Sequence, residues 1–214
     1  MIKIKSQLKE IINNKGFRRY SFNTAWVMSE KILRMFLGIF VISWIARYLG
    51  PQQFGLLNYA QSFVFLFTAI STLGLDSIVV RELVKQEDNR NKLLGSAFFL
   101  KLIGALDLLP VIGIAIQFTS NDNFTNLLVF IIAFATIFQS FNVIDFYFQS
   151  KVISKYAAIA NSVTFGISST IKILLILVNA PLVSFALMSI FDMAILAGGL
   201  ALFYFSYVKK HDSD

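Results

Sequence analysis

The stretch FTNLLVFIIAFATIFQSFNVIDFYF, residues 124–148, decides the fold class of this 214-residue chain. It holds one ionisable side chain, Asp145, in 25 consecutive positions. A helix needs about 20 mostly apolar residues to cross a hydrocarbon core ~30 Å thick, because each residue rises ~1.5 Å. Residues 124–148 are therefore predicted to form a helix that crosses a membrane.

Five more stretches of the chain are long and apolar enough to cross a membrane. The six predicted spans are 22–45, 54–80, 93–117, 124–148, 156–179 and 182–207. Turn-forming residues separate them, including Gly50-Pro51 and Asn179-Ala180-Pro181. Backbone polar groups in lipid must be paired within their own segment, and no run of about 10 alternating residues suggests barrel strands. We predict an all-α integral membrane bundle of six transmembrane helices.

Composition excludes several classes of protein. Hydrophobic residues make up 57% of the chain and charged residues 14%, whereas soluble domains have about 45–50% and about 25%. The mean hydropathy is +0.70, which rules out an ordinary soluble enzyme, a disordered tail and a collagen-like rod. The net charge of +7 is explained by cytoplasmic loops of a membrane protein, so no nucleic-acid partner is expected.

Residues that would support catalysis or metal binding are missing from the sequence. The chain has no Cys, and its one His, His211, lies in the polar tail. There is no GxxxxGK[ST] phosphate loop and no close Asp pair of the kind that a lipid-linked phosphotransferase needs for magnesium. We therefore expect a protein that is not an enzyme, with no catalytic residue, no metal site and no cofactor.

The basic residues alternate between the two sides of the predicted membrane. The segments on the side of the amino terminus carry fourteen Lys and Arg, and the loops on the other side carry only Arg47. Because cytoplasmic loops collect Lys and Arg, both termini are predicted to be cytoplasmic. Residues 1–20 form a basic segment, either an interfacial helix or a solvated tail; residues 21–207 form the transmembrane lobe and residues 208–214 a charged tail.

Seven ionisable side chains lie well inside the predicted spans. They are Glu30, Lys31, Arg34, Lys101, Asp107, Lys172 and Asp192. Each such residue costs ~2.5–3.5 kcal/mol on insertion scales and normally faces a partner or a wet cavity. The bundle is therefore expected to enclose an interior in which charges pair or meet water, as in a transport pathway.

Spacing along the helices predicts how these charges are arranged. Glu30 and Arg34 are four residues apart on one helix face, in the order that favours pairing, and Lys31 lies about 100° away from them. Lys101 and Asp107 lie on different faces, so each needs a partner from another helix. Lys172 and Asp192 are near mid-depth on consecutive spans, where they pair or, alternatively, Asp192 carries a coupling ion. Pro110 is expected to interrupt the third span.

Several motifs also carry a family resemblance. Asn23-Thr24-Ala25-Trp26 and Glu30-Lys31 precede the block Ala46-Arg47-Tyr48-Leu49-Gly50-Pro51, and Gly74-Leu75-Asp76 precedes Val79-Val80-Arg81-Glu82-Leu83. Leu94-Gly95-Ser96 and Leu100-Lys101 continue the match. From about residue 21 to residue 148 the chain resembles bacterial polysaccharide transporters, the flippases of O-antigen and capsule repeat units. They form part of the multidrug/oligosaccharidyl-lipid/polysaccharide exporter superfamily.

The resemblance implies a fold, a substrate and partners. Family members have two six-helix lobes around a central cavity and move undecaprenyl-pyrophosphate-linked oligosaccharide across the bacterial inner membrane for O-antigen (lipopolysaccharide), capsule or exopolysaccharide synthesis. Six spans correspond to the amino-terminal lobe alone. A second lobe would then come from another copy or a companion chain, and polysaccharide polymerase and assembly proteins are further expected partners beside membrane lipid.

The implied substrate suggests roles for the buried charges. A pyrophosphate in lipid must be neutralised by cations, and the Arg fork suits phosphate oxygens. The substrate-cavity candidates are Lys31, Arg34, Arg47, Lys101 and Lys172, and the ion-coupling candidates are Glu30, Asp107 and Asp192. Two alternatives stay open: a cation-coupled small-molecule exporter of the same superfamily, and a non-transporting membrane remnant or interaction subunit.

Overall fold

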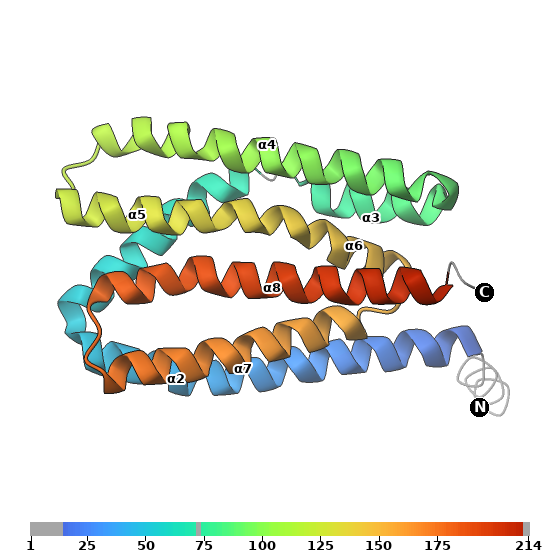
Figure 1. Cartoon of the computed structure of the whole chain (residues 1–214), viewed down its shortest axis with the longest axis horizontal. Helices are drawn as coiled ribbons and strands as arrows, with labels where there is room; N and C mark the ends of the chain where they lie inside the picture. The colour runs from blue at the N-terminus through green and yellow to red at the C-terminus, as the bar shows by residue number, and fades with distance from the viewer. Residues whose placement is uncertain (1–14, 72–73, 212–214) are drawn as a thin grey trace, which may run out of the picture.

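The computed structural model is an all-helical bundle (Figure 1) that describes residues 15–71 and 74–211. Its helices are α2 (Lys15–Ser71), α3 (Leu75–Lys85), η1 (Glu87–Asn89), α4 (Arg90–Gln117), α5 (Asn123–Ala135), η2 (Thr136–Asn142), α6 (Val143–Ser150), α7 (Lys155–Leu177) and α8 (Leu182–His211). The predicted all-α membrane fold is confirmed. Most of the basic segment 1–20 and the end of the tail 208–214 lie outside the described residues.

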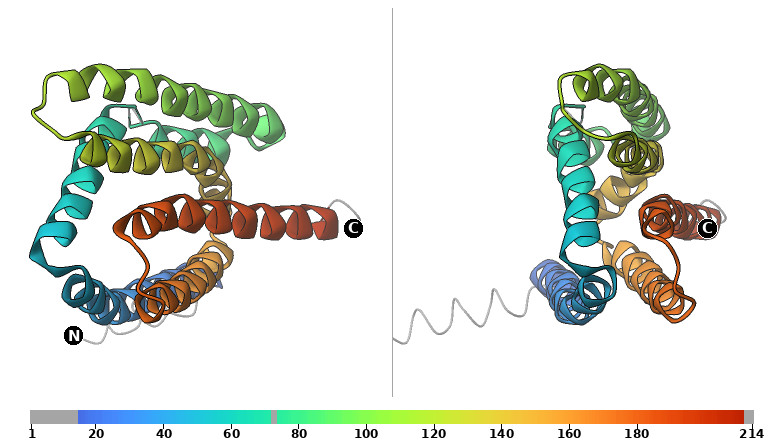
Figure 2. Two further views of the ribbon diagram at one scale, coloured as in Figure 1. Left: turned by 60° about the vertical axis from the view of Figure 1, so that its left-hand side comes forward. Right: turned by 90° about the vertical axis from the view of Figure 1, so that its left-hand side faces the viewer.

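The long helices run side by side, with one exception. The first arm of α2, α7, α8, the α5–α6 run and α4 lie along the long axis of the bundle (Figure 1). The second arm of α2 crosses them diagonally and joins the α7 side to the α4 side (Figure 2). The start of α2, the end of α8 and α3 lie at one end, which we call the terminal end; the opposite end, where α2 bends, is the Gly50 end.

The bend in α2 separates the first two spans. Gly50 has φ 71° and ψ 171°, a backbone conformation that side chains with a Cβ disfavour strongly, and Pro51 starts the second arm. Proline suits the first turn of a helix because its missing N–H would have no helical partner there. Within residues 15–71 and 74–211, five apolar helical stretches are long enough to cross a membrane, and they supply six crossings because α2 contains two of them.

The range 54–80, expected as one span, is divided in the structure. The second arm of α2 ends at Ser71, and a separate helix, α3, begins after Gly74, whose φ is 65°. The apolar residues of α3 pack against α4 and α6 through a cluster that includes Leu83, Ala97 and Phe146. Residues 81–85, expected in a loop, thus belong to an amphipathic helix.

The fourth crossing changes its winding halfway. It consists of α5, the 3-10 segment η2 and α6, which together cover residues 123–150. A 3-10 segment inside a long helix often marks a strained or hinging position. Asp122 caps the start of α5 by accepting hydrogen bonds from the hydroxyl and the backbone N–H of Thr125, and the Thr125 hydroxyl and N–H hold the pKa of this exposed carboxyl below its ordinary value.

The third crossing is one helix, contrary to the interruption expected at Pro110. Helix α4 runs from Arg90 to Gln117 with Pro110 inside it. Proline removes one backbone hydrogen bond but does not have to end a membrane helix, because its neighbours can satisfy the freed group. Pro110 lies on the exposed side of α4.

Two further apolar cores, beside the Leu83 cluster of α3, hold the bundle together. The larger core lies toward the Gly50 end and joins α2, α4, α5 and α8; its fully buried members include Ala60, Ile112, Leu128, Val129 and Ala186. The smaller core lies toward the terminal end, where Tyr147, Phe148 and Leu200 join α6, α7 and α8. Between the smaller core and the first arm of α2 the structure is hollow, as described below.

Two helices end with the same backbone turn. After α7, Asn179 has φ 55°, and the N–H of Ala180 donates to the carbonyl of Leu175 at 2.9 Å. After α6, Val152 has φ 55°, and the N–H of Ile153 donates to the carbonyl of Phe148 at 2.9 Å. Asparagine tolerates this left-handed conformation, whereas a β-branched valine is strained in it.

We expect Val152→Gly to stabilise the protein. Glycine removes a left-handed strain that costs roughly 1–2 kcal/mol for a residue with a Cβ. The gain should appear as a higher midpoint of thermal unfolding in detergent. Val178→Gly, at the C-cap of α7 where φ is an ordinary −89°, is the control and should lower the midpoint, because no left-handed strain is relieved there. A lower midpoint for Val152→Gly would contradict this account of the turn.

Candidate functional site: a polar cavity beside an apolar groove

Two polar cavities lie at the terminal end of the bundle. One, about 660 Å³, is lined from α3, η2, α6 and α7 by Asp76, Arg81, Asn142, Asp145, Gln149 and Asn161, with Leu196 and Leu200 from α8. The other, about 400 Å³, lies against the first arm of α2. Asp145, Gln149 and Asn161 line both cavities, so the two form one polar region, which we call the polar cavity.

Arg34 connects α2 to α7 at the inner end of the polar cavity. Its Nε lies 3.2 Å from Oε1 of Glu30, and its Nη1 donates to Oδ1 of Asn161 at 3.2 Å. Asn161 is held in turn because its amide donates to the carbonyl of Ala157 at 2.9 Å. The Glu30 side chain is 7% exposed and the Arg34 side chain 38%. The Arg34 side chain, which lines the cavity, is therefore partly accessible, while Glu30 is enclosed.

Lys31 and Asp145 face the same part of the polar cavity from opposite walls. Both line it, from α2 and α6 respectively, and they are near enough for their charges to interact. Gln149 donates to Oδ2 of Asp145 at 3.0 Å. Lys31 is exposed and has no hydrogen bond or ion pair within 4 Å among the residues described here. Its position, about 100° around the helix from Glu30 and Arg34, keeps it out of their ion pair.

An apolar groove begins where the polar cavity ends. It runs between the first arm of α2 and α7, has a volume of about 850 Å³, and is lined by Leu33, Leu37, Phe40, Trp44, Phe165, Gly166 and Ile173. Glu30 and Arg34 line both this groove and the polar cavity. Arg47, exposed near the Gly50 end, lines the far part of the groove. Thirteen residues separate Arg34 from Arg47, about 20 Å along a helix.

Lys101 is placed away from the cavity by an ion pair that spacing alone did not identify. Its Nζ lies 2.7 Å from Oδ1 of Asp76 and 4.5 Å from the ring centre of Phe146. The Lys101 side chain is 9% exposed, whereas Asp76 is 55% exposed and lines the polar cavity. Lys101 thus ties α3 and α6 to α4, and Asp76 is the member of the pair that a ligand could reach.

Lys172 and Asp192 form the pair expected from their depth. The Lys172 amine donates to Oδ2 of Asp192 at 2.7 Å. The pair lies in a separate cavity of about 210 Å³ that Asn58, Gln61 and Ser189 also line. Oδ1 of Asp192 is buried without a hydrogen-bond partner among the described residues.

Asp107 lies apart from the other charges. It is on the exposed side of α4, together with the exposed Ile103, Val111 and Ile114. No cavity given above includes it. The three ion-coupling candidates therefore occupy three different places: Glu30 at the polar cavity, Asp192 in the small cavity and Asp107 on the outer surface.

Sequence reasoning missed the uncharged half of the polar cavity. Asn142, Gln149 and Asn161 lie in apolar stretches, where an amide needs partners almost as an ion does. Their positions were a usable signal, because each is a polar side chain inside a predicted span or at its edge. Of the charged lining, the candidates included only Glu30, Lys31 and Arg34. The ionisable residues Asp76, Arg81 and Asp145, which lie near the predicted ends of spans, were left out as well.

This architecture defines a class: a polytopic helical membrane protein whose spans enclose a polar, charged cavity. A family model described as "polysaccharide biosynthesis protein" matches residues 22–213, so the chain belongs to that family. The match extends the resemblance beyond residue 148, into the last two spans. No curated protein matches the chain, and no solved structure matches it.

The Lys172–Asp192 pair offers a test of how buried charges are balanced. Lys172→Met should lower stability by about 3 kcal/mol, because it leaves a part-buried carboxylate without its cation. Asp192→Asn in the same chain should restore most of the loss. Thermal unfolding of the two single variants and the double variant in detergent measures this coupling. Additive losses in the double variant would show that the two side chains do not depend on each other.

Proposed function

We propose that this chain is a flippase, or half of one, for undecaprenyl-pyrophosphate-linked oligosaccharide repeat units. It would move them across the bacterial cytoplasmic membrane for O-antigen, capsule or exopolysaccharide synthesis. Membership in a polysaccharide biosynthesis family supports the pathway. The single observation that carries the proposal is Arg34, which Glu30 and Asn161 hold at the point where a polar cavity meets an apolar groove.

The two compartments match the two parts of such a substrate. Saccharide hydroxyls need hydrogen-bond donors and acceptors, which the amides and carboxylates of the polar cavity offer. A pyrophosphate needs cations, and Arg34 and Lys31 meet it from one helix. The apolar groove beside them suits a hydrocarbon chain. We assign no catalytic step, cofactor or metal to the chain.

The direction of transport follows from the predicted orientation. The fourteen basic residues outside the membrane on the side of the amino terminus favour a cytoplasmic terminal end. The polar cavity, which lies at that end, would then receive substrate from the cytoplasm. Arg47, near the other end, would meet the pyrophosphate on its arrival at the periplasmic side.

Transport by this fold requires a second lobe. Alternating access depends on two halves that rock about a shared site near mid-depth. Lys31 and part of Arg34 remain exposed on one side of the bundle, and a facing lobe would close that side. We propose that a second lobe faces this one across the site; polymerase and assembly proteins would be later partners.

We propose Glu30 as the residue that couples a proton or a sodium ion to substrate binding. It competes with phosphate for Arg34, because both are anions and it lies 3.2 Å from the guanidinium. The coupling cation, once bound at Glu30, would weaken that ion pair and free Arg34 for the substrate. Asp192 and Asp107 are the alternative coupling residues, although neither contacts a phosphate-binding candidate that faces the polar cavity.

The flippase proposal predicts a specific loss in Arg34 variants. Arg34→Ala should abolish complementation of a strain that lacks its own flippase, and Arg34→Lys should restore only part of it, because a lysine cannot offer the bidentate fork. Surface polysaccharide at equal expression is the measurement. Lys92→Ala, an exposed cation in the first turn of α4, is the matched control and should complement fully. Full complementation by Arg34→Ala would contradict the proposal.

The competition between Glu30 and phosphate predicts a gain in binding. Glu30→Gln should tighten binding of undecaprenyl pyrophosphate by about tenfold, which corresponds to ~1.4 kcal/mol, because a neutral amide no longer competes with phosphate for Arg34. Titration of the protein in lipid nanodiscs with the pyrophosphate lipid measures the affinity. Unchanged affinity in Glu30→Gln would remove Glu30 from the coupling mechanism.

The size and apolar lining of the groove favour a second candidate, a cation-coupled exporter of small amphipathic molecules. A fluorescent amphipathic cation that binds more tightly than the pyrophosphate lipid would support it. If neither ligand binds and complementation fails with every companion chain, a non-transporting interaction subunit remains as the better description.

A further inference from the structure

We propose that the groove between the first arm of α2 and α7 holds the isoprenoid chain of a polyprenyl phosphate carrier while its phosphate is bound at Arg34. The inference rests on the proposed function and adds a site for the part of the substrate that never leaves the membrane. It concerns Leu37, Phe40 and Trp44 on α2 and Phe165, Gly166 and Ile173 on α7.

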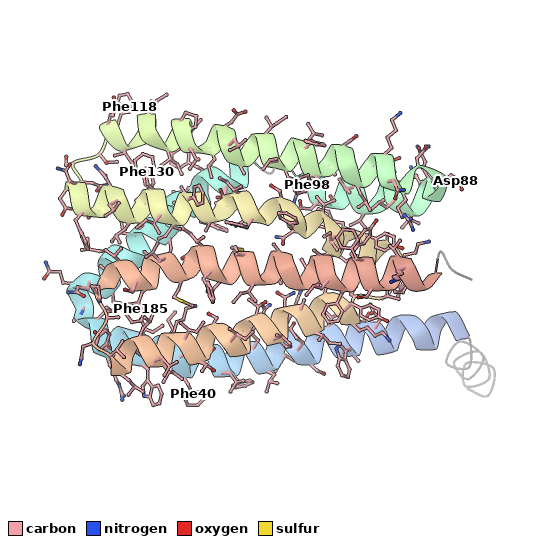
Figure 3. The ribbon with its side chains drawn as sticks, viewed as in Figure 1. Phe40, Asp88, Phe98, Phe118, Phe130 and Phe185 are labelled. Carbon is pink, nitrogen blue, oxygen red and sulfur yellow. The ribbon has the colours of Figure 1, made fainter. Side chains whose placement is uncertain are left out.

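The shape and lining of the groove fit one flexible hydrocarbon chain. The groove is formed by two helices only and continues along the crossing from Arg34 to Arg47. Its α2 wall is open to the surroundings: Leu37, Phe40 and Trp44 are each about half exposed or more, and Phe40 points away from the bundle (Figure 3). A chain can therefore enter sideways from the lipid without passing through the polar cavity.

Gly166 gives the groove part of its width. A Cβ at Gly166 would have no heavy atom of a neighbour within 4 Å, so the backbone of α7 faces open space there. Close helix packing does not explain this glycine, since nothing packs on it. The open space opposite Gly166 is where the chain would lie.

The depth of Arg34 distinguishes a carrier in transit from an ordinary phospholipid. Arg34 lies twelve residues after the expected start of the first span at residue 22, which is about 18 Å along a helix. The midplane of a ~30 Å hydrocarbon core lies ~15 Å from its edge. The phosphate of a resting phospholipid stays at the membrane surface, so an anionic head group reaches Arg34 only on a lipid that is crossing the membrane.

The two arginines give the carrier a polar contact at each end of the groove. Arg34 is fixed by Glu30 and Asn161 at the polar cavity, and Arg47 is exposed near the Gly50 end. The residues between them on the groove wall are mainly apolar. A phosphate that leaves Arg34 finds its next cation on the same helix at Arg47, and the chain can stay against the same wall throughout.

The test is photo-crosslinking in lipid nanodiscs with undecaprenyl phosphate that carries a diazirine in its chain. Labelled peptides should come from residues 37–44 of α2 and 162–173 of α7. Unlabelled undecaprenyl phosphate should compete for the label, and phosphatidylglycerol at the same concentration should not. Equal labelling of every lipid-facing helix, including the exposed face of α4, would overturn the proposal. This test uses the unchanged protein and needs no variant.

A matched pair of glycine variants sharpens the test. Gly166→Leu fills the groove and should lower labelling about tenfold, equivalent to ~1.4 kcal/mol of lost binding. Gly198→Leu is the control: it makes the same change on α8, outside the groove, where a Cβ also has open space. This variant should be labelled as strongly as the unchanged protein. Unreduced labelling in Gly166→Leu would also overturn the proposal.

The same variants separate failure of the groove from failure of the flippase function. If the crosslinked peptides come from outside the groove while Arg34→Ala still loses complementation, the groove assignment is wrong and the flippase proposal stands. If the groove is labelled but no variant or companion chain supports complementation, the groove binds a carrier lipid that this chain does not transport.

Discussion

The contact of Arg34 with Glu30 and Asn161 is the interaction on which the arrangement of the site depends. It is the polar connection between the first arm of α2 and α7 at the depth where the polar cavity gives way to the apolar groove. A charge in hydrocarbon is stable only when it is paired or hydrated. Arg34 is both, because Glu30 neutralises it on one side and the cavity reaches it on the other. The site can therefore hold a cation ready for an anionic ligand without the full cost of an unpaired buried charge.

The other buried charges serve the fold. Lys101 and Asp76 bring α3 against α4, and Lys172 and Asp192 join α7 to α8. Both pairs have an N–O distance of 2.7 Å, the range of strong charge-assisted hydrogen bonds. Lys101 and Lys172, two of the candidate phosphate-binding cations, are therefore already paired with carboxylates. Lys31 and the exposed part of Arg34 are left for a ligand in the polar cavity.

The sequence predicted the helical class, the approximate ends of most spans, and the ion pairs Glu30–Arg34 and Lys172–Asp192. Hydropathy and the i, i+4 distance of Glu30 and Arg34 are local properties, so they can be read along the chain. The Lys101–Asp76 and Arg34–Asn161 contacts join residues far apart in sequence, and no periodicity indicates which helices become neighbours. The break before α3 and the 3-10 segment η2 were also missed. Each depends on backbone dihedral angles, which hydropathy does not report.

The single-residue bend at Gly50 has a mechanical consequence. The two arms of α2 meet with one non-helical residue between them, so there is no slack loop to absorb a change in the tilt of either arm. A change in the angle between the arms must therefore be taken up by the φ and ψ angles of Gly50 itself. The first arm carries Arg34, and the second crosses the bundle diagonally to the α4 side. The backbone of this one residue thus sets the angle between the arm that faces the ligand and the arm that joins the two sides of the bundle.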